Sequence, residues 1–333
     1  MKTELNLDVS AALAAVTGKT ISNVFLVACG GSLSIMHPGK YFLDRHADQL
    51  NSDVYNGDEF VTRDPRKLGG ESLVILCSQT GTTKETVRAA RHAREKGATT
   101  IGMTLDPKSP LAEAVDHVVA YQAPYTTGIA IDAADSNYGV LYMILAGLLR
   151  QVENKDVVTS LLSSLSHLQP AIEKAHVQYA SLFDTFAARF QDLSVIYTTA
   201  SGANYGAAYS FSICVLMEML WINSQAIHAD EFFHGPFEVV DKNASFICFV
   251  GMDETRRLEE RARDFLFKYG DAKNVLVLDA EDLDLDGIDD GFKGYLVPLI
   301  FFDALWKFAY KLAAKRETVM LDGRRYMKKI TNY

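Results

Sequence analysis

The chain has 333 residues, of which 48% are hydrophobic and 23% are charged, values typical of globular proteins. They exclude a disordered chain, a collagen and a small disulfide scaffold. The formal net charge of −9 argues against nucleic acid as a partner, because a nucleic-acid-binding surface is basic. An anionic ligand would have to be held by local donors against the overall field of the protein.

Two apolar stretches are dense enough to be considered as membrane spans. Tyr138 to Leu149 is too short, and Pro298 to Ala314 is interrupted by Asp303 and Lys307, whereas a span needs about 18 apolar residues in a row. The N-terminus lacks the apolar region of a signal peptide. We therefore expect a cytoplasmic protein without a membrane partner.

The cysteines lie singly inside apolar segments and lack the CxxC spacing of zinc and redox sites. They are Cys29, Cys77, Cys214 and Cys248. We expect reduced thiols in the core, as in proteins of reducing compartments.

Short apolar runs alternate with helical patterns along the chain, as in a parallel α/β sheet. The first half contains four such runs: "NVFLVACGGS", "SLVILCSQTG", "TTIGMTLD" and "HVVAYQA". The second half contains three: "SVIYTTASG", "SFICFVG" and "NVLVLDA". Between them, residues 134–189 have leucines and isoleucines at helical spacing and no Gly/Ser-rich run. The sequence therefore predicts an α/β protein with a helical connector.

The two sets of strands align at a nearly constant offset. This offset pairs Gly31 with Gly202, Gly97 with Gly270 and Asp106 with Asp279. The helices before Gly97 and Gly270 end at the same relative place, as glycine C-caps would require. An internal duplication explains the pattern, and generic α/β spacing is the alternative. We expect two tandem doubly wound parallel-sheet subdomains, residues 1–150 and 191–333, joined by the connector 151–190.

Small polar residues follow the first two predicted strands, "CGGS" at 29–32 and "SQTGTT" at 78–83. Ligands of open α/β sheets bind beyond the carboxyl ends of the strands. Each loop runs into a helix, whose free N–H groups and dipole favour an anion. Hydroxyl donors are added by Ser32, Ser78, Thr80 and Thr83. The loops predict a phosphate cradle, with plain helix capping as the alternative, and neither fits a nucleotide-binding pattern.

Glu218 is the one charge in the otherwise apolar helical run "FSICVLMEMLWIN". A helix that is apolar all round is buried. A buried carboxylate without a cationic partner has a raised pKa, which suits a general acid or base near neutral pH. The alternative is a structural Glu that caps a helix or pairs with an Arg.

His234 lies in "HADEFFHGPFE" and is followed by Gly-Pro, which ends any helix. A His at such a break can face a pocket, and an ordinary surface or core His is the alternative. Glu231 and His234, with His228 and Glu238 nearby, also allow a metal-site interpretation. That interpretation lacks a second cluster with ligand spacing.

The C-terminus "LDGRRYMKKITNY" is basic and aromatic in an acidic protein. It predicts either a solvated tail or a strap over an anionic site.

These features together resemble the sugar isomerase (SIS) domain family, whose best-known member is the isomerase half of glucosamine-6-phosphate synthase. The resemblance is carried by "ACGGS" with "CSQTGTT", by the duplication, and by a Glu followed sixteen positions later by the His of "E-x-x-H-G-P". Four segments are similar to the fructosamine-6-phosphate deglycase branch: "IYTTASGANYGAAY", "MEMLWINS", "EFFHGPFE" and "RRYMKK".

The resemblance implies three-layer, flavodoxin-like subdomains and a sugar phosphate bound by the two loops. The residues implied for the phosphate are Gly31, Ser32, Ser78, Gln79, Thr80 and Thr83. Glu218 and His234 would be the acid/base pair. The resemblance also implies a homodimer or higher homo-oligomer whose active site takes the His segment from the partner, and it implies no metal or organic cofactor.

The sequence departs from the synthase branch at two places. The Lys one turn before the catalytic Glu is missing, since this stretch is "VLME", which argues against aminosugar isomerisation. The synthase closes its site with a Lys near the C-terminus, and Lys329 is the residue that could match it.

The expected activity is hydrolysis of a 6-phosphorylated fructosamine to glucose 6-phosphate and a free amino acid. Ring opening, proton transfer between C1 and C2 and imine hydrolysis need only an acid/base pair and water. The alternatives are an aldose–ketose or aminosugar phosphate isomerase or deaminase, a non-catalytic phosphosugar sensor, and a metal-dependent hydrolase using Glu231 and His234. No motif marks the amino acid that the substrate carries.

Overall fold

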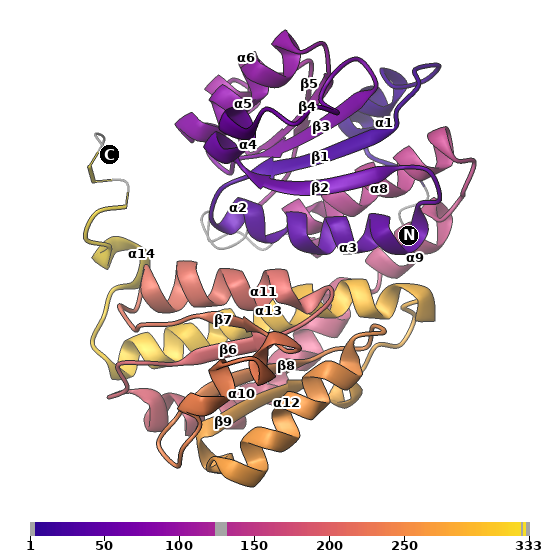
Figure 1. The fold of residues 1–333 in the computed structure, drawn as a ribbon. Helices are drawn as coiled ribbons and strands as arrows, with labels where there is room; N and C mark the ends of the chain where they lie inside the picture. Colours follow the sequence, from indigo (N-terminus) through magenta and orange to yellow (C-terminus); the bar gives the residue numbers. More distant parts are fainter. Residues whose placement is uncertain (1–3, 124–131, 328, 331–333) are drawn as a thin grey trace. The chain divides into compact units, whose positions relative to one another are not determined.

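The computed structural model describes residues 4–123, 132–327 and 329–330. The chain divides into two units (Figure 1), one formed by Met1–Gln169 with Gly287–Phe292 and the other by Pro170–Asp286 with Lys293–Tyr333. Each unit contains one parallel sheet. In the described ranges, no helix is both long and apolar enough to cross a bilayer. The boundaries expected at 150/151 and 190/191 stay a prediction.

The first unit is built on a five-stranded parallel sheet with the order β2-β1-β3-β4-β5, the flavodoxin-like order. The strands are β1 Asn23–Ala28, β2 Asn51–Asn56, β3 Ser72–Cys77, β4 Thr99–Thr104 and β5 His117–Ala120. Every position of β1, β3 and β4 is buried. Such continuous apolar runs are typical of strands covered by helices on both faces.

Two groups of helices cover this sheet. One group packs together as α1 Leu7–Ala14, α3 Met36–His46 and α8 Asn137–Val152, and the other as α4 Gly57–Arg63, α5 Lys84–Glu95 and α6 Pro110–Ala114 (Figure 1). The other helices that the structure describes in this part of the chain are the short α2 Gly31–Ser34, the 3₁₀ turn Ala133–Asp135 and α9 Val158–Leu165. The three-layer arrangement confirms the predicted architecture.

The second unit has a four-stranded parallel sheet with the order β7-β6-β8-β9. The strands are β6 Tyr197–Ala200, β7 Ala226–His228, β8 Phe246–Val250 and β9 Val275–Asp279. This is the order of the first sheet without its last strand, as the predicted duplication requires.

The helices of the second unit again lie on both faces of the sheet. They are α10 Leu168–Phe190, α11 Asn204–Ser210, α12 Arg256–Tyr269, α13 Asp290–Lys315 and α14 Met320–Gly323, with a π-helix at Phe211–Met217. Short 3₁₀ turns lie at Glu231–Phe233, Pro236–Val239, Ala272–Asn274 and Ala280–Asp282. Along β8, Phe246 and Cys248 belong to the cluster with α12 residues Ala262 and Leu266, whereas Phe249 meets Phe301 of α13.

Two strands were absent from the predicted set. β2 and β7 each pair with the first strand of their sheet at its edge. β2 reads "NSDVYN" with half-exposed and exposed positions, and β7 has only three residues. Neither has the apolar run that identifies the buried strands.

Both predicted glycines end their helices, Gly97 directly after the cap residue of α5 and Gly270 as the cap residue of α12, but only Gly97 is left-handed. Gly97 after α5 has φ +83°, the left-handed conformation expected of a capping glycine. Gly270 after α12 has φ −87°. A Cβ at Gly270 would lie 2.7 Å from the Leu266 carbonyl oxygen, so close packing accounts for this glycine.

Candidate active site

The two polar loops of the first unit start side by side. β1 and β3 are parallel neighbours, and their last residues Ala28 and Cys77 are register partners. The loops 29–32 and 78–83 follow directly, so Gly31 and Ser32 begin α2 while Thr83 precedes α5. Because both loops leave the same edge of the sheet at adjacent strands, their donors can meet one ligand.

Hydroxyl pairs order the second loop. Ser78 Oγ lies 2.9 Å from Thr83 Oγ1, and Thr80 Oγ1 lies 2.7 Å from Thr82 Oγ1. The Thr83 side chain makes no capping bond to the first turn of α5, so its hydroxyl is directed to the loop.

Gly81 fixes the turn of this loop. It has φ +65°, and a Cβ there would come within 2.0 Å of Ser109 Oγ. The Gln79 carbonyl oxygen accepts the Leu105 N–H at 3.0 Å, so the loop backbone is tied to the end of β4. Position 81 therefore requires glycine both for its conformation and for its contact.

Glu218 follows a π-helix in the second unit. Glu218 N donates to the Ile213 carbonyl five residues back at 3.1 Å, and Leu220 N does the same to Val215. The chain then turns at Trp221, which has φ +56°, a conformation that costs a bulky residue energy. Wide turns and backbone outliers of this kind occur often at functional sites.

Of the two alternatives left open for Glu218, the structure shows a partly exposed carboxylate with a cationic partner. The helix is open on one side, where Met217 is 44% and Trp221 41% exposed. The Glu218 side chain is 18% exposed, and its Oε1 accepts a hydrogen bond from Arg324 Nη1 at 3.0 Å. The alternative of pairing with an Arg is therefore the one found in this structure.

Glu218 and the C-terminal segment enclose an open pocket of about 370 Å³. It is lined by Met217, Glu218, Trp221, Ile222, Asn223, Arg324, Arg325, Tyr326 and Met327. Sequence reasoning did not single out Arg324. The basic, aromatic composition of the tail was the available signal, and contact with Glu218 favours the strap over the solvated tail.

His234 follows the 3₁₀ turn Glu231–Phe233 and is exposed. The segment around it is held by aromatic rings, because Phe233 and Phe237 pack edge-on against Phe265 of α12 at 5.6 and 5.7 Å. Gly235 has φ +131°, a conformation that favours glycine. The turn after His234 therefore requires glycine at this position. His234 does not line the pocket that contains Glu218.

Two other predictions, the metal site and the role of Lys329, are not placed at a site among the described residues. No group of three or more potential metal ligands occurs among the described residues, and Glu231, like His234, is exposed. Lys329 Nζ lies 3.4 Å from the Asp322 carbonyl oxygen and does not line the pocket.

All four cysteines are free thiols. Cys77 and Cys248 are buried, and burial raises the pKa of Cys77 to about 11. Cys29 and Cys214 are only half-buried, so the expectation of core thiols holds for two of the four.

The loop after β6 is the counterpart, in the second unit, of the loop after β1. Its backbone N–H groups donate to carboxylates of the same unit: Ser201 N to Glu259 Oε1 at 2.8 Å, and Ala203 N to Asp253 Oδ2 at 2.9 Å. Gly251 N at the end of β8 donates to Glu259 Oε2 at 2.6 Å. The protein's own carboxylates thus occupy the donors that would otherwise be offered to a ligand.

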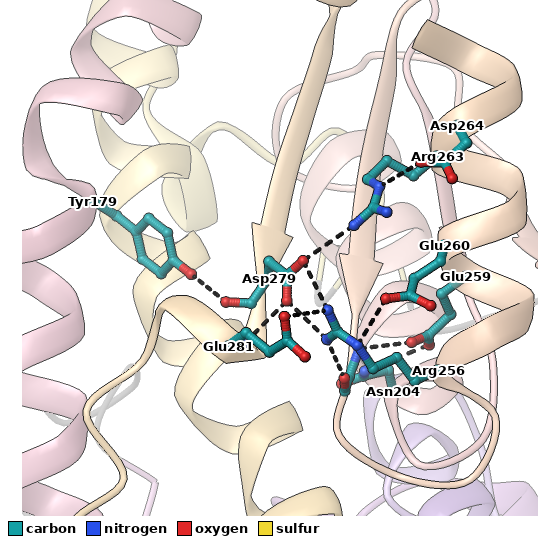
Figure 2. A network of polar contacts seen from close by, with 10 residues as sticks. Tyr179, Asn204, Arg256, Glu259, Glu260, Arg263, Asp264, Asp279 and Glu281 are labelled. Carbon is teal, nitrogen blue, oxygen red and sulfur yellow. Dashed lines mark hydrogen bonds and ion pairs between the residues drawn. The ribbon is translucent and has the colours of Figure 1, made fainter. Parts of the chain in front are cut away.

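Ion pairs between α12 and the end of β9 lie next to Glu259 (Figure 2). Arg256 of α12 makes a bidentate contact with Asp279 at the end of β9, with N–O distances of 2.8 and 3.1 Å, and its Nε donates to Glu260. Arg263 adds a second cation to Asp279 at 3.2 Å. A bidentate, partly buried network of this kind fixes the strand ends rigidly.

Comparison with known proteins places the chain among sugar isomerase proteins. The SIS domain model matches residues 20–147. Fructosamine deglycase FrlB of Bacillus subtilis (strain 168) is 50% identical over 98% of both chains. Fructoselysine 6-phosphate deglycase of Escherichia coli (strain K12) is 29% identical, covering 95% of this chain and 88% of its own.

Solved structures with the same fold support this family placement. A crystal structure from Bacillus subtilis, 50% identical, superposes with a TM-score of 0.94 over 98% of both chains. The C-terminal domain of glucosamine-fructose-6-phosphate aminotransferase from Francisella tularensis shares the fold, with a TM-score of 0.76 at 20% identity over 96% of this chain and 90% of that one. The duplicated sheets, the paired polar loops and the full-length similarity establish that the chain belongs to the SIS domain family, in its fructosamine deglycase branch.

Proposed function

We propose that this chain is a fructosamine-6-phosphate deglycase. It cleaves a 6-phosphorylated fructosamine with water and releases glucose 6-phosphate and a free amino acid. The observation that carries this function is the 50% identity to a fructosamine deglycase over 98% of both chains. The two polar loops and the carboxylate pocket supply groups that such a reaction needs.

The reaction is a series of proton transfers. His234 assists opening of the sugar ring, and Glu218 moves a proton between C1 and C2 through an enaminol and protonates the departing nitrogen. Water then adds to the C1 imine, and the C–N bond breaks to give the aldehyde and the amine. In this proposal Gly31, Ser32, Ser78, Gln79, Thr80 and Thr83 hold the phosphate, whose binding energy orients the reacting carbons.

The test couples the purified protein to glucose-6-phosphate dehydrogenase and follows NADPH. The substrates are 6-phosphorylated fructosamines of Lys, Asp, Gln and Glu, fructoselysine 6-phosphate being the first of them, with glucosamine 6-phosphate and fructose 6-phosphate as controls. Turnover of a fructosamine supports the proposal and identifies the amino acid. A signal from fructose 6-phosphate alone would make the protein an isomerase, and no signal from the panel would refute the deglycase.

Removing two hydroxyls of the cradle should weaken binding of the phosphate. The double variant Ser78→Ala/Thr83→Val is expected to raise KM by about 10- to 100-fold, since each lost hydrogen bond weakens binding by ~0.5–1.5 kcal/mol. Both partners of the 2.9 Å contact are removed together, so no buried hydroxyl is left unsatisfied. Thr62→Val, at an exposed position of α4 outside the loop, is the matched control and should change KM by less than about threefold. Equal KM values in the double variant and the control would remove these hydroxyls from the phosphate site.

We also propose a cytoplasmic homodimer in which His234 acts in the partner's active site. Exposure of His234, and its place away from the pocket of its own Glu218, support this arrangement. Phosphorylated substrates and four free thiols fit a reducing compartment.

Co-expression of Glu218→Gln and His234→Asn subunits tests the shared site. Each variant alone should be inactive, and a mixed dimer should regain one intact site. Random pairing should then restore about a quarter of wild-type activity, because half of the dimers are mixed and each has one of two sites. Absence of any restoration in isolated mixed dimers would show that both residues act within one subunit.

A further inference from the structure

Arg324 is held by two hydrogen bonds, one of which joins its guanidinium group to Glu218. Its Nε donates to the Leu321 carbonyl oxygen at 2.8 Å, and its Nη1 donates to Glu218 Oε1 at 3.0 Å. Its side chain is 21% exposed and lies at the wall of the pocket. A guanidinium group has five donors in a planar fork, so Arg324 can take a second acceptor from the pocket.

The neighbouring Arg325 fixes the segment that carries Arg324. Its guanidinium carbon lies 4.0 Å from the centre of the Trp221 ring, a cation–π contact. Trp221 in turn has the outlying φ of +56°. The C-terminal segment is therefore attached next to Glu218 by a contact that does not involve Glu218.

The charges lining this pocket sum to a positive value. Glu218 supplies the negative charge, and Arg324 and Arg325 supply two positive charges. The chain as a whole has a net charge of −9, but this pocket is locally cationic. It therefore favours an anion. An Arg fork recognises a carboxylate with two parallel hydrogen bonds.

The substrate of the proposed reaction has two anionic ends. Its phosphate is on C6, at the far end of the sugar chain from the reacting C1 and C2. Its carboxylate belongs to the amino acid, which is attached through nitrogen to C1. A cation in contact with the group that acts at C1 is therefore placed for the carboxylate and not for the phosphate.

We propose that Arg324 is a specificity-determining residue that binds the carboxylate of the substrate's amino acid. This inference rests on the proposed deglycase function. When the substrate enters, the guanidinium group keeps its bond to Glu218 and offers its remaining donors to the incoming carboxylate. A substrate without a carboxylate lacks this contact and binds more weakly.

The test compares two substrates that differ in this one charge. They are the 6-phosphorylated fructosamines of glycine and of glycinamide, in which an amide replaces the carboxylate. Wild-type protein should prefer the carboxylate by about 10- to 100-fold in kcat/KM, the effect of one charge-assisted hydrogen bond. Arg324→Gln should remove this preference, mainly through KM, and Arg324→Lys should retain part of it. Arg257→Gln, at an exposed position of α12, is the matched control and should keep the preference.

The outcomes separate this inference from the function on which it rests. If wild-type protein processes both substrates equally well, Arg324 does not read the carboxylate, and the deglycase function stands. If Arg324→Gln loses activity equally on both substrates through kcat, Arg324 only positions Glu218 and the inference is overturned. If neither these substrates nor the amino-acid panel is processed, the proposed function fails and the inference fails with it.

Discussion

Glu218→Gln is expected to lower kcat by about 10²- to 10⁴-fold, the usual contribution of one positioned acid or base. The amide keeps the size of the side chain and can still accept from Arg324, but it cannot take up or release a proton. KM should change little, because the phosphate loops are untouched. The measurement is the coupled assay at saturating substrate. His234→Asn should cause a loss of the same order.

Folding should survive both substitutions. The Glu218–Arg324 pair is partly exposed, and such pairs contribute no more than about 1 kcal/mol to stability. Glu281→Gln is the matched control, since this Glu is 67% exposed and pairs with Arg256 outside the pocket; it should keep activity within about twofold. Wild-type kcat in either active-site variant would show that the residue has no acid or base role.

The stability of the wild-type protein is expected to fall between pH 4.5 and 8 because of Glu259. This Glu is 2% exposed, and burial raises its pKa from 4.5 to about 8 against the opposing effect of its N–H donors. The nearby Asp253 carboxylate raises it further. Between the two pKa values the folded state holds a proton that the unfolded state has released, so rising pH favours unfolding. The contribution lost is on the order of 5 kcal/mol.

A hydrogen-bond acceptor lies beside Glu259 for its carboxyl group when that group is protonated. Within the described part of the chain, the buried Oδ1 of Asn204 has no hydrogen-bond partner, while its Nδ2 lies 3.5 Å from Glu259 Oε1. Rotating the amide by half a turn places Oδ1 towards the carboxyl group. A protonated Glu259 can then donate to Asn204 while Ser201 and Gly251 still donate to its two oxygens.

Urea unfolding of wild type and Glu259→Gln at pH 5.5, 7 and 8.5 measures this effect. Gln cannot titrate, and its NH₂ group faces a backbone donor, so the variant should be less stable by about 1–3 kcal/mol at pH 5.5. The difference should vanish or change sign by pH 8.5, because only the wild type loses stability through this group, by about 3 kcal/mol between pH 5.5 and 8. The difference between the two proteins cancels the titration of all other groups. Parallel pH profiles would mean that Glu259 does not titrate in this range.

The buried part of the fold could be predicted from sequence because its strands carry continuous apolar runs. "SLVILC" has no exposed position as β3, so hydrophobicity alone identifies it. The edge strands β2 and β7 are specified mainly by the partner strand beside them, which a local pattern does not contain.

The candidate site also contains residues that a local sequence pattern identifies and residues that it does not. The polar loops follow buried strands and were found from that position, whereas Arg324 is 106 residues from Glu218 in the chain. No local pattern connects the two residues, so the sequence left open whether Glu218 is isolated or pairs with an Arg. The carboxylates that occupy the loop after β6 could not be found from the sequence either. Glu259 lies in a helix with an ordinary charged pattern, and nothing in that pattern connects it to the loop.

The π-helix at Phe211–Met217 has a consequence for how Glu218 could have been positioned during evolution. Each residue of an α-helix turns the chain by about 100°, and a π-helix holds one residue more per turn. A single inserted residue can therefore carry Glu218 to a different side of the helix while the residues before it keep their packing against the sheet. In a duplicated fold, such an insertion lets one copy present a reactive group on a surface that was formerly only structural.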